Sequence, residues 1–329
     1  MGPLDVILLP FGSAGDMNPF VFLGRALVER GHRVAALVGE HFESPFADVG
    51  VEPVRIGSRA EYEEAESHPD LFHPRRGFDV VASFVPRYIE RVIPILESRR
   101  GDRTLLVAAG FSFAARAFSE ARNLPLVSVH LQPSVILSVE RPPMLARGLG
   151  WLERAPRSVR RTVMGLVHRR IDARLAGPVN DCRRRLGLST PVRRVMDQWW
   201  HSPRLVLAMW PEWFAPRAAD WPPQVVFARF ALEDGRGGSP VDADLERFEA
   251  LAGEDPSPAG RPILFTAGSA MRHGQRFFAA AARAAQMLGR RAALVVRDRA
   301  QVPAALPAGV EWFGYLPFSK AFPRCAAVV

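Results

Sequence analysis

Cysteine is nearly absent from this chain of 329 residues, which contains only Cys182 and Cys325. Two cysteines so far apart provide neither a disulfide framework nor the ligand spacing of a zinc site, and the histidines are scattered, so no bound metal is expected. The sequence also lacks a run of about 18–20 apolar residues, the length needed to span a membrane. The first residues include Asp5 but no basic stretch, unlike a signal peptide. These absences predict a cytoplasmic protein.

Lysine is rarer still, since Lys320 is the only one. Arginine therefore supplies almost all the positive side-chain charge, and the net charge is +9. Residues 154–185 hold ten arginines against Asp172 and Asp181, with Glu153 directly before them. One interpretation is a solvated helix face. Another is a surface that approaches an acidic substrate or anionic lipid, which would bring the protein to the inner face of the membrane as a peripheral partner. Nucleic acid is not an expected partner, because no aromatic residues are interleaved and no nucleic-acid motif occurs.

Strand-like apolar runs alternate with helical patterns along most of the chain. Hydrophobic residues are 48% of the sequence and charged residues 23%, as in a typical globular protein, and the length suggests about two domains. The expected strands are residues 6–11, 33–39, 51–56, 104–109, 126–131 and 204–210. The expected helices are residues 19–29, 78–98, 113–122 and 159–186. Runs of valine, isoleucine and leucine separated by helices predict a doubly wound α/β domain with a parallel sheet.

Glycine, proline and acidic residues interrupt this rhythm at residues 233–261, which predicts an interdomain linker with one short helix at 242–252. The rhythm then restarts, with strands at 262–267, 292–296 and 310–314, a helix at 275–288 and a last strand at the end of the chain. We therefore expect a first domain over residues 1–232. Residues 262–329 are expected to form the first part of a second Rossmann-like domain, which makes the chain a C-terminally truncated one.

A glycine-rich turn follows the first expected strand and reads Phe11-Gly12-Ser13-Ala14-Gly15-Asp16-Met17-Asn18-Pro19. Doubly wound folds bind their ligands at this carboxyl end of the strands. Gly12 and Gly15 permit tight backbone geometry and close approach of a substrate, and Pro19 suits the first turn of a helix. Two roles remain open for Asp16: it caps the helix, or it takes a proton from a hydroxyl nucleophile.

A second turn, Phe265-Thr266-Ala267-Gly268-Ser269-Ala270, also joins a strand to a helix. Free N–H groups at a helix N-terminus attract phosphate, and Gly268 and Ser269 let it come close. A simple tight turn is the alternative. The first turn fits a dinucleotide fingerprint poorly, because it lacks the third glycine and no acid other than Glu40 ends the second strand, and it is not a P-loop.

Together the two turns resemble those of family 1 glycosyltransferases of the GT-B fold, which move a sugar from a nucleotide diphosphate to an acceptor hydroxyl. Residues 12–19 look like the family's N-terminal glycine turn, in which the position of Asp16 holds the base. Residues 264–269 look like the donor-phosphate turn, and residues 313–317 look like the strand end that meets the nucleobase. Within the family, stretches such as residues 183–192 and 198–203 are most similar to the B subunit of the rhamnosyltransferase of rhamnolipid synthesis.

The resemblance implies a UDP-sugar or dTDP-sugar as co-substrate and no other cofactor. A hexosyl group of the rhamnose or glucose type would pass, with inversion, to a hydroxyl of a hydrophobic or lipid-like acceptor, with Asp16 as the catalytic base. The implied acceptor-binding residues are Gly12, Ser13, Gly15, Phe84, Tyr88 and His130. The implied donor-binding residues are Gly268, Ser269, Phe313, Tyr315 and Leu316. Further apolar surface for the acceptor would come from Phe78, Ile89, Val92, Trp199, Trp200, Trp210 and Trp213. Core packing is the alternative for the apolar residues and for His130.

Two features depart from the family pattern. The His-x-Gly-Gly turn of the donor domain does not occur, and the stretch after the fourth strand, where relatives with a histidine base carry an aspartate, reads Ala109-Gly110-Phe111-Ser112. A second hypothesis therefore stays open, that of a truncated, non-catalytic protein of glycosyltransferase ancestry that binds an acceptor or a partner. A nucleotide-sugar epimerase of the same fold ranks third, and a nicotinamide dehydrogenase ranks last.

Overall fold

The computed structural model describes residues 2–73, 75–143, 150–234, 239–268 and 271–329. The chain divides into two compact units. The first comprises Met1–Gly12 and Pro19–Ala231, and the second comprises Ser13–Asn18 and Leu232–Val329. Each unit is built around a parallel sheet of its own, in the order β3-β2-β1-β4-β5-β6-β7 for the first and β10-β9-β8-β11 for the second.

The sheet of the first unit is parallel throughout. Its strands are β1 (Asp5–Leu9), β2 (Arg33–Gly39), β3 (Glu52–Gly57), β4 (Thr104–Ala109), β5 (Leu126–His130), β6 (Leu205–Ala208) and β7 (Val225–Phe227). The strand order reverses between β1 and β4, and this is the point at which doubly wound folds bind ligands. The predicted doubly wound α/β class is therefore confirmed. Strand β7 was not predicted, because three residues at a sheet edge are too short for a clear apolar run.

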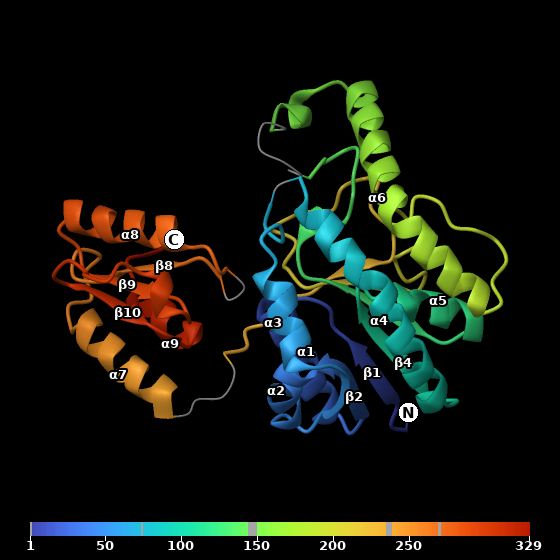
Figure 1. Cartoon of the computed structure of the whole chain (residues 1–329), viewed down its shortest axis with the longest axis horizontal. Helices are drawn as coiled ribbons and strands as arrows, with labels where there is room; N and C mark the ends of the chain where they lie inside the picture. The colour runs from blue at the N-terminus through green and yellow to red at the C-terminus, as the bar shows by residue number, and fades with distance from the viewer. Residues whose placement is uncertain (1, 74, 144–149, 235–238, 269–270) are drawn as a thin grey trace. The chain divides into compact units, whose positions relative to one another are not determined.

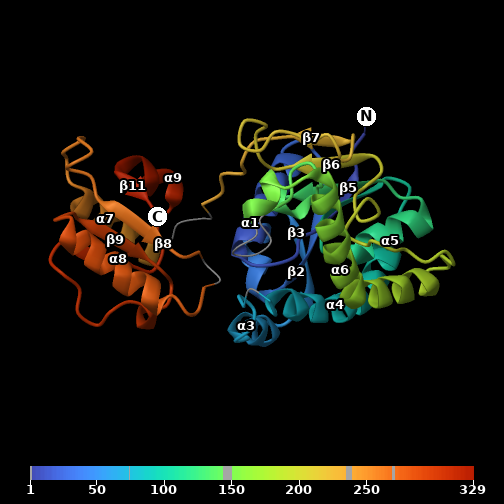
Figure 2. The same cartoon turned by 90° about the horizontal axis from the view of Figure 1, so that it is seen from above.

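Helices cover both faces of this sheet, as a parallel sheet requires. They are α1 (Ala14–Val28), α2 (Glu43–Ala47), α3 (Arg59–Ser67), α4 (Gly77–Arg99), α5 (Phe113–Arg122) and α6 (Arg157–Arg185). Helices α4, α5 and α6 pack against one another and lie together in both views (Figures 1 and 2). Their apolar residues share a core with Ile7 and Leu9 of β1. Gly24 of α1 faces Leu8 and Val51, on the opposite side of the sheet.

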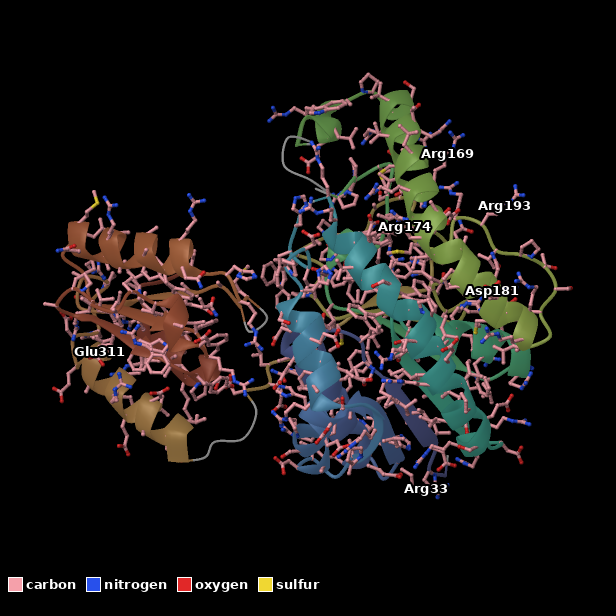
Figure 3. The ribbon with its side chains drawn as sticks, in the orientation of Figure 1. Arg33, Arg169, Arg174, Asp181, Arg193 and Glu311 are labelled. Carbon is pink, nitrogen blue, oxygen red and sulfur yellow. The ribbon has the colours of Figure 1, made fainter. Side chains whose placement is uncertain are left out.

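The arginine-rich stretch forms α6, and several of its side chains make ion pairs within the first unit. Arg170 and Arg174 contact Asp79 of α4, and Arg183 contacts Glu120 of α5. Figure 3 labels Arg174 on α6. These pairs attach α6 to its neighbouring helices. The described helices include none with the combination of length and apolar character that crossing a bilayer requires.

The second unit contains β8 (Ile263–Thr266), β9 (Ala292–Val295), β10 (Val310–Phe313) and β11 (Ala327–Val328), all parallel. Its helices are α7 (Ser239–Ala252), α8 (Gln275–Met287) and α9 (Phe318–Ala321). Phe248 and Leu251 of α7 are buried in one core with Phe313 and Leu316. The segment 233–261 was predicted as a linker with one short helix at 242–252. That helix forms as α7, but it packs into the core of the second unit, to which the segment belongs.

Candidate functional site

The glycine turn after β1 leads directly into α1. Gly12 has a φ of 129°, a conformation that disfavours any side chain. Helix α1 begins at Ala14, so Pro19 lies inside the helix and not in its first turn as predicted. The earlier start follows from Ser13, whose carbonyl accepts hydrogen bonds from the N–H groups of Asp16 and Met17. These bonds close the first turn ahead of the proline.

Asp16 lies in this first turn, with its carboxylate held by Ser13. The backbone N–H of Ser13 donates to Oδ2 at 2.7 Å, and the Ser13 hydroxyl donates to the same oxygen at 3.0 Å. No hydrogen bond between described residues reaches Oδ1. The two roles considered for Asp16 are thus compatible, because one oxygen stabilises the helix start and the other remains for chemistry.

Burial raises the pKa of Asp16 above its usual value, and the two hydrogen bonds from Ser13 act in the opposite direction. A carboxylate with a raised pKa is a stronger base than an ordinary aspartate. This property suits a group that must take a proton from a hydroxyl.

Buried polar side chains connect the ends of β1 and β4 to α4. The Ser112 hydroxyl donates to the carbonyl of Leu9 at 2.8 Å, so the Tyr88 hydroxyl, 3.1 Å away, donates to Ser112. Phe11 packs edge-on against Tyr88 and stacks with Phe111. Burial raises the pKa of Tyr88. Tyr88, predicted to bind the acceptor, is therefore a core residue with a satisfied hydroxyl.

His130, at the end of β5, is also buried, with 2% of its surface exposed. Its Nε2 lies 3.0 Å from Nδ1 of His201, and the indole N–H of Trp200 donates to Nε2 of His201 at 3.0 Å. This donor fixes the tautomer: neutral His201 carries its proton on Nδ1 and donates it to His130. The core alternative describes His130 better than the predicted acceptor contact. The sequence offered no signal that His201 would be its partner.

The remaining aromatic residues separate into core and surface. Trp200 and Trp210 are buried, whereas Trp213 is 79% exposed and contacts Phe214 and Phe230. On α4, Phe84 is half-buried. Phe84 and Trp213 are thus two of the predicted acceptor-binding apolar residues whose side chains remain accessible to solvent.

The predicted donor-binding residues also include both exposed and buried ones. Gly268 is exposed with a φ of 86°, and a Cβ built on it would meet no atom within 4 Å. Ser269 lies outside the described residues. Phe313 and Leu316 are fully buried in the core, so their side chains cannot contact a nucleobase.

Tyr315 is the exposed member of this group, with 40% of its surface accessible. Its hydroxyl donates to the carbonyl of Asp234. Its backbone N–H, like that of Gly314, donates to Asp244 of α7. The loop after β10 is therefore fixed by two acidic residues from the segment that was predicted as a linker. Among the described residues, no group of three or more His, Cys, Asp or Glu side chains could hold a metal ion.

Comparison with known proteins supplies the family context. No protein-family model matches the chain. The O-mycaminosyltylonolide 6-deoxyallosyltransferase of Streptomyces fradiae is 29% identical over an alignment of 350 positions, which covers 99% of this chain and 75% of the relative. The solved glycosyltransferase of kitacinnamycin has a TM-score of 0.66 and 17% identity, over 100% of this chain and 75% of that one. The chain has the GT-B glycosyltransferase fold.

A second solved GT-B structure, the spinosyn rhamnosyltransferase SpnG complexed with thymidine diphosphate, matches with a TM-score of 0.60 and 19% identity, over 99% of this chain and 74% of that one. These likenesses support the predicted resemblance to family 1 of the GT-B enzymes. The narrower likeness to the rhamnosyltransferase of rhamnolipid synthesis stays a prediction, and so do the individual site residues.

Proposed function

We propose that this chain is a glycosyltransferase that moves a hexosyl group from a nucleotide-diphosphate sugar to a hydroxyl of a hydrophobic small molecule, with inversion. The relative from Streptomyces fradiae is named for transfer of a 6-deoxyhexose, and SpnG was solved with thymidine diphosphate. These names favour a dTDP-deoxyhexose of the rhamnose type over a UDP-sugar as the donor. They also support a natural-product acceptor ahead of a lipid.

Asp16 is the proposed general base, and its geometry carries the proposal. Ser13 orients the carboxylate through Oδ2 at the carboxyl end of β1. Oδ1 then takes the proton of the acceptor hydroxyl as the hydroxyl oxygen attacks the anomeric carbon. The bond from that carbon to the diphosphate oxygen breaks, and the nucleoside diphosphate leaves with the electron pair. The sugar is inverted because attack and departure occur on opposite faces.

The leaving diphosphate is the second charge that the protein must stabilise. Gly268 lets the backbone come close to a phosphate, and the following helix, α8, directs the free N–H groups of its first turn toward the same end. For the acceptor, Phe84 of α4 and the exposed Trp213 are the apolar contacts that we propose.

The test is the variant Asp16→Asn. Its amide oxygen still accepts the N–H of Ser13, so the start of α1 is retained, but the amide cannot take a proton. Transfer from a dTDP-sugar should fall by about 10²–10⁴-fold, the typical contribution of a general base. The affinity for thymidine diphosphate, measured by calorimetry, should not change.

Asp5→Asn is the matched control, because Asp5 lies on β1 and pairs with Arg33 on the protein surface. It should leave transfer intact. If Asp16→Asn keeps most of its activity, Asp16 serves only the helix start. If the wild-type chain binds thymidine diphosphate but transfers no sugar to any hydroxyl acceptor, the non-catalytic alternative takes precedence.

A further inference from the structure

A buried glutamine lies beside the turn that follows β8. Gln301 ends the short 3-10 turn Arg299–Gln301, which comes soon after β9, and only 2% of its surface is exposed. Because β8 and β9 are parallel neighbours, the segments after them lie at the same edge of the sheet. A polar side chain buried this deeply must have hydrogen-bond partners, or the fold loses stability.

Both ends of the Gln301 amide are used, and both bonds go to the segment that precedes α8. Oε1 accepts the backbone N–H of Gly274 at 2.8 Å, and Nε2 donates to the carbonyl of Met271 at 2.9 Å. One side chain therefore holds the two ends of the stretch 271–274. The backbone of Gln301 is itself fixed, because its N–H donates to the carbonyl of Asp298.

Gly274 is the residue from which α8 starts, and the packing around it is tight. A Cβ on Gly274 would lie 2.8 Å from Oε1 of Gln301 and 2.9 Å from the ring of Phe278. The amide of Gln301 thus occupies the space that a side chain at residue 274 would need.

We propose that Gln301 is a positioning residue for the donor diphosphate. It does not touch the donor; it fixes Met271 and Gly274, and with them the start of α8, so that the first N–H groups of this helix keep their direction toward the diphosphate. An anion site made of backbone N–H groups depends on their directions, since each hydrogen bond weakens steeply as it bends. This inference rests on the proposed function, because it presumes that the turn at Gly268 receives a nucleoside diphosphate.

The experiment compares the binding of thymidine diphosphate to the wild-type chain and to Gln301→Met by calorimetry. Methionine has nearly the same length and makes neither hydrogen bond. We expect an affinity about tenfold lower, because N–H groups that are no longer held in one direction bind an anion more weakly. In transfer assays the KM for the donor should rise, while the KM for the acceptor stays the same. A purely structural role would lower the melting temperature and leave both the affinity and the donor KM of the folded protein unchanged.

Gln224→Met is the matched control. The Gln224 amide also donates to a backbone carbonyl, that of Ser202, but in the first unit. It should not alter the binding of thymidine diphosphate. If Gln301→Met does not fold, Gln301→Asn decides the question, since it keeps a neutral amide but is one methylene too short to reach both Gly274 and Met271. An intermediate affinity is then expected.

Equal affinity of wild type and the folded Gln301 variant would overturn the positioning role and leave the proposed function standing. Absence of binding to the wild-type chain would overturn the donor assignment, and the positioning role with it.

Discussion

The indole ring of Trp200 occupies the space where a side chain at Gly110 would lie. A Cβ built on Gly110 would come within 2.6 Å of Cζ3 of Trp200 and within 3.1 Å of Cε1 of His130. Residue 110 follows β4, next to the point where the strand order reverses. Only glycine fits at residue 110 while the indole of Trp200 stays where it is. An acidic side chain therefore has no room at residue 110, directly after β4.

Gly110→Ala should therefore destabilise the first unit. Overpacking of a closed core typically costs about 1–3 kcal/mol, and the urea midpoint of unfolding measures it. Gly165→Ala is the matched control: Gly165 lies within α6, and an added Cβ there would meet no atom within 4 Å. That substitution should stabilise the protein by about 0.5–1 kcal/mol, because alanine favours a helix. Equal effects of the two substitutions would contradict the packing described for Gly110.

The pair His130 and His201 should make the protein sensitive to acid. Burial lowers the pKa of His201 to about 4, and burial together with His201 lowers the pKa of His130 well below its usual value. The unfolded chain takes up these protons near pH 6.5, whereas the folded chain resists them. The contribution of the two neutral histidines to the free energy of unfolding is therefore fully present above about pH 6.5 and is lost as the pH falls toward about 4.

From His201 alone, the loss between about pH 7.5 and about pH 5 should be about 2 kcal/mol. Urea denaturation at the two pH values measures it. His201→Gln should reduce the difference, since a glutamine has no such proton to take up. The exposed His68→Gln should not. An unchanged difference in His201→Gln would mean that other groups govern the acid sensitivity.

Ser13→Ala should move the pH dependence of transfer. The base must be deprotonated, so activity falls as the pH drops through the pKa of Asp16. The Ser13 hydroxyl lowers that pKa, and its removal should raise it further. The acid limb of kcat/KM should therefore shift to higher pH, with little change on the alkaline side. Ser83→Ala, which removes a hydroxyl bonded to a carbonyl of α4, should leave the profile in place. A shift to lower pH in Ser13→Ala would contradict Asp16 as the base.

Glu120 should be more sensitive to substitution than a surface carboxylate that pairs with an exposed arginine. It accepts hydrogen bonds from Arg183 at 2.6 Å, from the indole of Trp199 at 2.9 Å and from Arg116 at 3.3 Å. The Arg183 side chain is only 4% exposed. Glu120→Ala leaves this buried charge without its partner, which should cost about 2–3 kcal/mol, less than for a fully buried pair because Glu120 itself is partly exposed.

Thermal unfolding measures that loss. Glu43→Ala is the control, since Glu43 forms an ion pair with Arg55 at the surface, and it should shift the melting temperature little. If both variants have the same melting temperature, the ion pair of Arg183 and Glu120 contributes no more to stability than an exposed ion pair.

Local pattern was sufficient for most of the elements. The predicted helix 113–122 coincides with α5, and the predicted helix 78–98 differs from α4 by one residue at each end. The glycine turn was also found correctly between a strand and a helix. The start of α1 was not, because it depends on how Ser13 and Asp16 hydrogen-bond to each other. Proline at residue 19 was a weaker guide than this capping interaction.

The sequence by itself determined the α/β class, the strands of the two sheets except β7, and the turns at Asp16 and Gly268, because apolar periodicity and glycine act within a few residues. Only the tertiary structure decided that Tyr88 and His130 are buried, that His201 is the partner of His130, that α7 belongs to the second unit and that Gln301 holds the start of α8. These facts depend on pairs of residues far apart in the chain. Such pairs meet only when the sheets have formed, and no local pattern records them.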